Sequence, residues 1–312
     1  MQHEATNYAW SSQVLPGYIN PSSGLCFNVL VTAARSGDVM LATEVFRTLG
    51  QRSTIFTSAH YEELIHAYLG ADTPDLRAAL SAMTLMAGSN VELSLPSTRF
   101  LFTYLQENPE QVDEAFQMLV TLRESGRKVP VAVINTLIEA YADQGEFEQA
   151  FICYKSAHEF GPPEHPGNAR DVYVTIDTFN NLLKGARDAR EPVPLQTAMF
   201  LVSEMRALGV KPTSLTYDRI LLVCLKSNDF DLAWQYYEEM EGLGWSPRSG
   251  TSIQLAKKLA RVKDFRCWDV LQRVQSDKVL SMQVTFHIKN NWVESRQPDA
   301  SDEEAEVVQS TQ

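Results

Sequence analysis

Apolar side chains recur at helical spacing in the middle of the chain, most clearly in residues 131–159. Two segments there repeat apolar residues three or four positions apart, with Gly145 between them. The first segment holds Leu137, Ile138 and Tyr141, and the second holds Phe147, Ala150, Phe151 and Tyr154. Glycine ends a helix readily because it adopts the left-handed conformation without a Cβ penalty. The pattern therefore predicts a helical hairpin.

The pattern returns at a fixed offset further along the chain. The residues MRALGVKP at 205–212 are matched 35 positions later by MEGLGWSP at 240–247, with Met, Leu, Gly and Pro in register. A period of about 20 to 50 residues indicates a solenoid, in which no single unit can bury its apolar face alone. The repeat predicts one elongated all-helical stack rather than two or three globular domains, and it directs the search for function to a surface.

One small residue in each unit, where two helices must approach closely, sets the register of the whole stack. These residues are Ala42, Ala78, Ala115, Ala150, Ala198 and Ala233, with Trp268 where a seventh alanine would fall. Their spacings of 36, 37, 35, 48, 35 and 35 predict seven units, the last of them degenerate. Residues 160–175 hold three prolines and two glycines, so we interpret the long spacing as an inserted loop.

The repeats are predicted to occupy residues 25–274, after an N-terminal segment at 1–24. Residues 275–293 are expected to form a cap or an extended segment, because 282–288 alternate like a strand without an obvious partner. Residues 294–312 are acidic and nearly free of large apolar groups, which predicts a disordered tail.

The net charge of −12 bears on the choice of ligand. The tail carries a net −5, so residues 1–293 still carry −7, whereas proteins that hold nucleic acid nonspecifically are usually basic. No apolar run reaches 18 residues, so no membrane span is predicted. The N-terminus shows neither a signal peptide nor a mitochondrial presequence. The four separated cysteines, Cys26, Cys153, Cys224 and Cys267, are expected to be reduced core residues in a reducing compartment.

Motifs for catalysis do not occur. The chain has no phosphate-binding glycine loop, no nucleophile elbow and no HExxH helix. His158 and His165, with Glu159 and Glu164, flank the proline-rich insertion, but a metal site there is not favoured. The sequence predicts a protein that is not an enzyme and needs no cofactor or metal.

The repeat units resemble pentatricopeptide repeat proteins. The resemblance lies in INTLIEAYADQGEFEQAFICY (134–154), TFNNLLKGARD (178–188) and LTYDRILLVCLKSNDFDLAWQYYEEMEGLGWSP (215–247), and it extends loosely over residues 25–274. The tetratricopeptide repeat, with a 34-residue period, is the competing family. The 35-residue period, Asn or Asp after an aromatic or aliphatic residue, and a closing G-x-x-P favour the pentatricopeptide class. The resemblance implies a right-handed α-solenoid that binds single-stranded RNA, one base per repeat.

In this family, two residues of each unit read a base edge together. By resemblance the pairs would be Asn135 with Thr175, Asn180 with Thr213, and Asp218 with Arg248. Asn in the first place is similar to pyrimidine readers, because an amide both donates and accepts hydrogen bonds. Thr and Arg in the second place depart from the usual Asp, Asn or Ser. The alternative is that Asn and Asp near a helix start only cap the helix.

Three further residues match other family positions. Leu215 would pack between neighbouring bases, and Lys226 and Arg261 would face phosphates. Asp143 and Asp188 stand at the phosphate position in two preceding units, where they oppose a polyanion.

By resemblance the protein would bind mitochondrial RNA. It would act in transcript processing, stability or translation, or in maturation of the small ribosomal subunit, with the mitochondrial ribosome or other proteins as further partners. The alternative is a helical-repeat scaffold or assembly factor for a mitochondrial complex. The negative charge of the repeats and the aspartates favour that alternative.

Overall fold

The computed structural model describes residues 2–52, 54–93, 95–160 and 174–294, and within these ranges it contains helices and turns but no strand. The helices follow one another in pairs that match the predicted units. The pairs are α2 (Ser23–Arg35) and α3 (Val39–Gln51), α4 (Ser58–Leu69) and α5 (Leu76–Gly88), α6 (Leu95–Glu107) and α7 (Gln111–Glu124), α8 (Val131–Asp143) and α9 (Phe147–Phe160), α10 (Ile176–Asp188) and α11 (Leu195–Ala207), α12 (Ser214–Lys226) and α13 (Phe230–Gly242), and α14 (Ser249–Arg261) and α15 (Arg266–Arg273). The predicted all-α solenoid of about seven helix-turn-helix repeats is confirmed.

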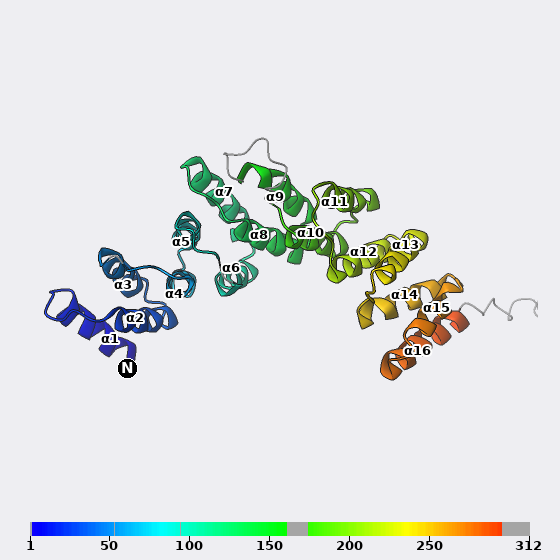
Figure 1. The fold of residues 1–312 in the computed structure, drawn as a ribbon, viewed down its shortest axis with the longest axis horizontal. Coiled ribbons are helices and arrows are strands. Elements are labelled where there is room, and N and C mark those ends of the chain that lie inside the picture. Colours follow the sequence, from blue (N-terminus) through cyan, green and yellow to red (C-terminus); the bar gives the residue numbers. More distant parts are fainter. Residues whose placement is uncertain (1, 53, 94, 161–173, 295–312) are drawn as a thin grey trace, which may run out of the picture. The chain divides into compact units, whose positions relative to one another are not determined.

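The chain divides into two compact units, residues 1–192 and 193–312. Within the first unit, the first helices of successive pairs, α2, α4, α6, α8 and α10, contact one another in order, and α3, α5 and α9 pack against their own partners (Figure 1). Within the second unit, α12, α14 and α16 (Lys278–Glu294) contact one another in the same order, with α13 and α15 packed on α12 and α14. Each unit is therefore a stack whose first helices lie side by side.

In three pairs the turn ends in an aspartate that caps the second helix, and in two of them this aspartate follows a residue of left-handed conformation, Gly37 or Asn228. Asp38, Asp75 and Asp229 begin α3, α5 and α13, and each carboxylate accepts a hydrogen bond from the backbone N–H three residues later at 2.8–3.0 Å. Such caps satisfy N–H groups that have no partner inside the helix. Gly145 has φ +75° between α8 and α9, as its position in the sequence predicts.

Small side chains lie where the two helices of a pair meet. Ala42, Ala115, Ala150, Ala198 and Ala233 are wholly buried, as predicted. In the pair α4–α5 the wholly buried residue is Ala79 rather than the predicted Ala78. Asp75 caps α5, and the contact position is the fourth residue after the cap. Trp268 is partly exposed, and Cys267 and Val270 fill the core of the last pair instead.

Both ends of the repeat array carry additional helices. Residues 278–294 form α16, so the strand-like alternation at 282–288 does not produce an extended segment. Leu280, Val284 and Ile288 are buried at a spacing of four and form the face that packs on α14, and this contact outweighs the local alternation. Within 1–24, α1 (Gln2–Ala9) and a π-helical turn (Trp10–Val14) precede α2, which is capped by Ser22. Most of the inserted loop, 161–173, and the tail from 295 lie outside the described residues.

The four cysteines are free thiols inside the helical core, as predicted. Burial raises the pKa of Cys153 and of Cys224 to about 12. Because the thiolate is the reactive form, these residues act as small apolar core groups.

We expect Ala150→Trp to force α8 and α9 apart, because Ala150 is wholly buried between them. Overpacking of this kind costs about 1–3 kcal/mol or more. Urea unfolding followed by circular dichroism measures the change, and Gln149→Trp, at an exposed neighbouring position of the same helix, is the matched control. Equal midpoints for the two variants would contradict the assigned packing.

We also expect Cys153 and Cys224 to resist a thiol reagent at pH 8 in the native protein. With a pKa of about 12, each thiol is ionised to only ~10⁻⁴ at this pH. Unfolding in guanidinium returns the pKa to about 8.5 and should restore rapid labelling of all four cysteines. Rapid labelling of Cys153 before unfolding, located by peptide mass spectrometry, is the contrary result.

Candidate nucleic-acid interface

The predicted reading residues occupy equivalent places on the first helices. Asn135, Asn180 and Asp218 are the fifth residues of α8, α10 and α12. They are buried, with exposed fractions of only 9%, 4% and 4%. None of the three caps its own helix, so the capping alternative is wrong for them. The caps of α10 and α12 are Thr175 and Thr213, the residues proposed as second members of reading pairs.

Asn135 and Thr175 are brought together as the resemblance implied. Asn135 Nδ2 donates to Thr175 Oγ1 at 3.1 Å, and Thr178 Oγ1 donates to Asn135 Oδ1 at 2.6 Å. Asn181 Nδ2 donates to the backbone oxygen of Asn135 at 3.2 Å. The amide of Asn135 therefore joins α8 to the start of α10, and both of its polar ends are engaged inside the protein.

Asp218 and Arg248 also contact each other, but Arg248 uses its backbone N–H and not its side chain. The backbone N–H of Arg248, the N-cap residue of α14, donates to Asp218 Oδ1 at 2.9 Å. The carboxylate of Asp218 thus receives a donor at the start of the next first helix, in the same manner as Asn135. The guanidinium of Arg248 belongs to an exposed residue.

Asn180 and Thr213 lie in the two separate units, and the pairing predicted for them stays a prediction. The side-chain oxygen of Asn180 is buried and has no hydrogen-bond partner within the described part of the chain. Thr213 caps α12 in a reciprocal arrangement, in which its backbone N–H donates to Thr216 Oγ1 at 3.0 Å. Leu215, the second residue of α12, is half-buried.

Charge is distributed unequally between the two units. Residues 193–293 carry 13 Lys and Arg against 10 Asp and Glu, a net +3, whereas residues 1–192 carry a net −10. Within the second unit the first helices α12, α14 and α16 hold seven bases and two acids. The second helices α11, α13 and α15 hold three bases and six acids. The positive charge of this unit is therefore concentrated on the stacked first helices.

Three cations gather where α12 and α14 end, and we call Lys226, Lys258 and Arg261 the cation edge. Lys258 Nζ donates to the backbone oxygen of Leu225 and to Asn228 Oδ1, so this lysine crosses from α14 to the end of α12. Arg261 Nε donates to Asn291 Oδ1 of α16 at 2.9 Å. These contacts show that the C-terminal ends of the stacked first helices lie close together.

The cation edge is electrostatically uncompensated in part. Among the side chains that the structure describes, which do not include that of Glu294, neither Lys258 nor Arg261 forms an ion pair with a carboxylate. Burial, together with the positive charge of Arg261, lowers the pKa of Lys258. Cations at helix C-termini also interact favourably with the helix dipole, which gives these residues a structural role besides any ligand contact.

The first unit differs at the equivalent helix ends. Asp143 and Asp188 stand there, as the sequence indicates, but Lys184 pairs with Asp143 and Arg187 with Asp188 at 2.5 Å. Arg99 of α6 pairs with Glu139 of α8 at 3.5 Å. These cations of the first helices are neutralised by neighbouring acids, so this part of the stack offers less positive charge to a polyanion than the second unit does.

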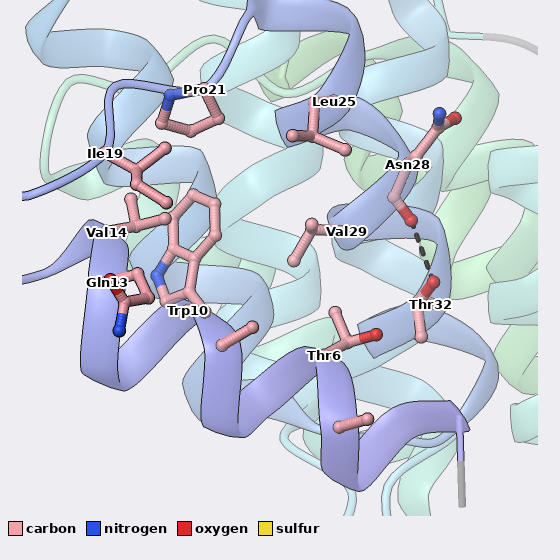
Figure 2. Close-up of a pocket in the computed structure, with 12 residues that line it drawn as sticks. Thr6, Trp10, Gln13, Val14, Ile19, Pro21, Leu25, Asn28, Val29 and Thr32 are labelled. Carbon is pink, nitrogen blue, oxygen red and sulfur yellow. Dashed lines mark hydrogen bonds between the residues drawn. The ribbon is translucent and has the colours of Figure 1, made fainter.

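A cavity of about 480 Å³ lies between α1, the π-helical turn and α2 (Figure 2). Trp10, Val14, Ile19 and Val29 give it an apolar wall, and Thr32 Oγ1 donates to the backbone oxygen of Asn28 at 2.9 Å on its other side. Its volume lies in the range of small-molecule pockets. The residues that line it are apolar or uncharged polar ones.

The other predicted chemistry concerns metals and membranes. No group of three His, Cys, Asp or Glu that could hold a metal ion is found in the part of the chain that the structure describes. The side chains of His158, Glu164 and His165 lie outside that part, and Glu159 pairs with Arg123 at 3.3 Å. No helix among the described residues is long and apolar enough to cross a membrane.

The sequence missed two features of this surface. Lys258 is not among the phosphate contacts predicted from the sequence. Its position one turn before Arg261 is a signal that could identify it. Thr178, which donates to Asn135, gives no signal in the sequence because only the stacking of α10 on α8 makes the contact.

Comparisons with solved structures return a helical-repeat protein. Against the crystal structure of the pentatricopeptide repeat protein PPR10 from maize, the chain aligns with a TM-score of 0.48 and 15% identity over 92% of this chain and 43% of that one. A second structure, with a TM-score of 0.46 and the same identity, holds PPR10 in complex with an 18-nucleotide psaJ RNA element.

Curated relatives come from Arabidopsis thaliana. The chain is 27% identical over 139 residues to the pentatricopeptide repeat-containing protein At5g10690, which is 42% of this chain and 22% of the relative. It is 23% identical over 259 residues to the mitochondrial pentatricopeptide repeat-containing protein At1g26460, and this match covers 82% of this chain and 36% of the relative. The matches thus span little more than a third of these relatives at most.

Family models cover most of the repeat region. A model described as pentatricopeptide repeat-containing protein matches residues 23–157, a pentatricopeptide repeat domain matches 166–227, and a PPR repeat matches 215–245. The matched ranges begin at α2 and run through α13, which are the helix pairs that repeat with a period near 35 residues. The chain belongs to the pentatricopeptide repeat family.

Proposed function

We propose that the protein binds single-stranded RNA along the first helices of its repeats, with most phosphate contacts on those of its second unit, and that it catalyses no reaction. The observation that carries this proposal is the concentration of positive charge on α12, α14 and α16, with the cation edge at their ends. Phosphate contacts supply most of the nonspecific affinity for nucleic acid. Pentatricopeptide repeats read RNA one base per helical repeat, which supports RNA as the ligand of a chain of this family.

The contacts within two of the predicted residue pairs are consistent with reading of RNA bases. Asn135 with Thr175, and Asp218 with Arg248, meet at the junction of successive first helices, where a base edge could approach two repeats at once. Their hydrogen bonds within the protein would have to be shared with, or exchanged for, bonds to the base. Leu215 would then pack between neighbouring bases, and Lys226 and Arg261 would contact phosphates.

We place the protein in mitochondria, acting in transcript processing, stability or translation, or in maturation of the small ribosomal subunit. This location is supported by the relative At1g26460, which is named as a mitochondrial protein and aligns with 82% of this chain. The mitochondrial ribosome is a partner consistent with these roles.

A second candidate function is that of a protein-interaction scaffold, for example an assembly factor for a mitochondrial complex. The observation that favours it is the net −10 of residues 1–192, where first-helix cations are paired with acids. Such a surface suits a basic protein partner better than a polyanion. The two functions are compatible when each uses a different unit.

We expect the double variant Lys226→Gln and Arg261→Gln to weaken RNA binding and to reduce its salt dependence. Each phosphate contact to a single strand contributes about 0.7 to the slope of log K against log salt, so the slope should fall by about 1.4. Fluorescence anisotropy with a labelled RNA of about 20 nucleotides at several KCl concentrations measures both changes. Lys155→Gln with Lys211→Gln, two exposed lysines that lie outside the first helices, is the control. A wild-type chain that binds no RNA at low salt refutes the proposal.

We expect Asn135→Ala to destabilise the first unit. The change removes the acceptor of Thr178 and leaves a buried hydroxyl without its partner, which costs about 1–3 kcal/mol. Chemical unfolding measures this loss, with Asn290→Ala at an exposed helical position as the control. If Asn135 also reads a base, affinity should change more for one of four homopolymeric RNAs than for the others, at a temperature where the variant remains folded.

A further inference from the structure

Three aromatic side chains form a cluster at the last helix pair, and we call Phe265, Trp268 and Trp292 the aromatic cluster. The ring centroids of Phe265 and Trp292 are 5.4 Å apart, and those of Trp268 and Trp292 are 6.1 Å apart. Phe265 is 75% exposed and Trp268 is 38% exposed. The rings therefore contact one another at the surface, where Phe265 and Trp268 are exposed to solvent instead of filling the core.

The aromatic cluster adjoins the cation edge. Arg261 lies four residues before Phe265, and its guanidinium binds Asn291, the neighbour of Trp292 in the chain. The turn between them holds Lys263 in a left-handed conformation, with φ +58°. Arg261 of the cation edge and the three rings thus come from the same junction of α14, α15 and α16.

The acids near this junction are largely neutralised. Asp264 accepts hydrogen bonds from Arg266 at 2.9 Å and 3.0 Å, which hold the pKa of its carboxyl below the ordinary value. Arg266 also pairs with Asp231 at 2.8 Å. The remaining acid on α15 is the exposed Asp269. Two of the acids near the rings, Asp264 and Asp231, are therefore paired with Arg266, which reduces their repulsion of a phosphate chain.

We propose that the aromatic cluster is an accessory base-stacking site for single-stranded RNA, outside the positions that read base edges. The inference rests on the proposed RNA binding, and it extends that binding to the end of the second unit. Surfaces that hold single strands combine cations, which follow the phosphates, with aromatic rings on which bases stack. Stacking is tolerant of sequence because every base has a π-face, so this site would add affinity without base preference. A base paired in a duplex cannot offer its face in this way.

An exposed apolar surface also suits a protein partner, and Val262 extends the aromatic cluster with a further exposed side chain. The neighbouring cations, and the neutralised acids, favour the nucleic-acid ligand over that alternative. The test is therefore designed to separate stacking, simple charge attraction and protein association.

The experiment compares two oligonucleotides of about 20 units with the same number of phosphates, one a polyuridine RNA and the other abasic. Phe265→Ala in the full chain should bind the RNA about 5-fold or more weakly than the wild type, and the abasic strand equally well. Phe200→Ala removes a ring of similar exposure on α11, a second helix of the same unit, and should change neither affinity. Phe265 is chosen because its exposure makes loss of folding the least concern, and circular dichroism checks this.

A spectroscopic reading complements the affinities. Stacking of a base on Trp268 or Trp292 should quench tryptophan fluorescence, and polyuridine should quench it while the abasic strand does not. The variant Trp292→Phe should lose most of this quenching. Quenching that is unchanged in both Trp292→Phe and Trp268→Phe would count against the site.

The outcomes distinguish this inference from the function on which it rests. Wild-type affinity of Phe265→Ala for RNA overturns the stacking site and leaves the proposed function standing. Equal losses for the RNA and the abasic strand also overturn it, because bases would then play no part. A change in sedimentation of Phe265→Ala without a change in RNA affinity assigns the cluster to a protein interface instead. A wild-type chain that binds neither strand overturns both proposals.

Discussion

Each first helix in this protein has two apolar sides, and burying both of them is the constraint on which the structure depends. One side packs against the second helix of its own pair, where a wholly buried alanine such as Ala150 permits close approach. The other side packs against the next first helix, as α8 does on α10 and α12 does on α14. A pair cannot satisfy both contacts alone, so stability within each unit comes from neighbours.

The stacking of first helices also decides where polar groups lie. Because successive first helices run side by side, the fifth residue of one helix comes next to the start of the following one. Asn135 uses this proximity to bind Thr175 and Thr178, and Asp218 uses it to bind the N–H of Arg248. The positions that the family uses for reading bases are therefore also junctions that hold adjacent repeats together, and the two roles draw on the same hydrogen-bonding atoms.

Net charge alone gave a misleading view of the surface. The −7 of residues 1–293 argues against a polyanionic ligand, yet it is the sum of an acidic first unit and a second unit of net +3. Within the second unit the helical pairing separates bases onto the first helices and acids onto the second helices. A short-range ligand responds to that local arrangement rather than to the total, since interactions beyond about 8–10 Å are screened at physiological salt.

The sequence by itself determined the helix pairs, because their apolar spacing, caps and 35-residue period are local properties of the chain. Asp38 and Gly145 mark their turns without any knowledge of neighbours, and the resemblance of residues 134–154 to a known repeat follows from the same local pattern. Only the tertiary structure decided that residues 278–294 form a helix, that Asn135 is bonded to Thr178, and that Phe265 and Trp292 meet beside Arg261. Each of these depends on contacts between residues far apart in sequence, 43 positions for Asn135 and Thr178 and 27 for Phe265 and Trp292, and a local pattern contains no information about such contacts.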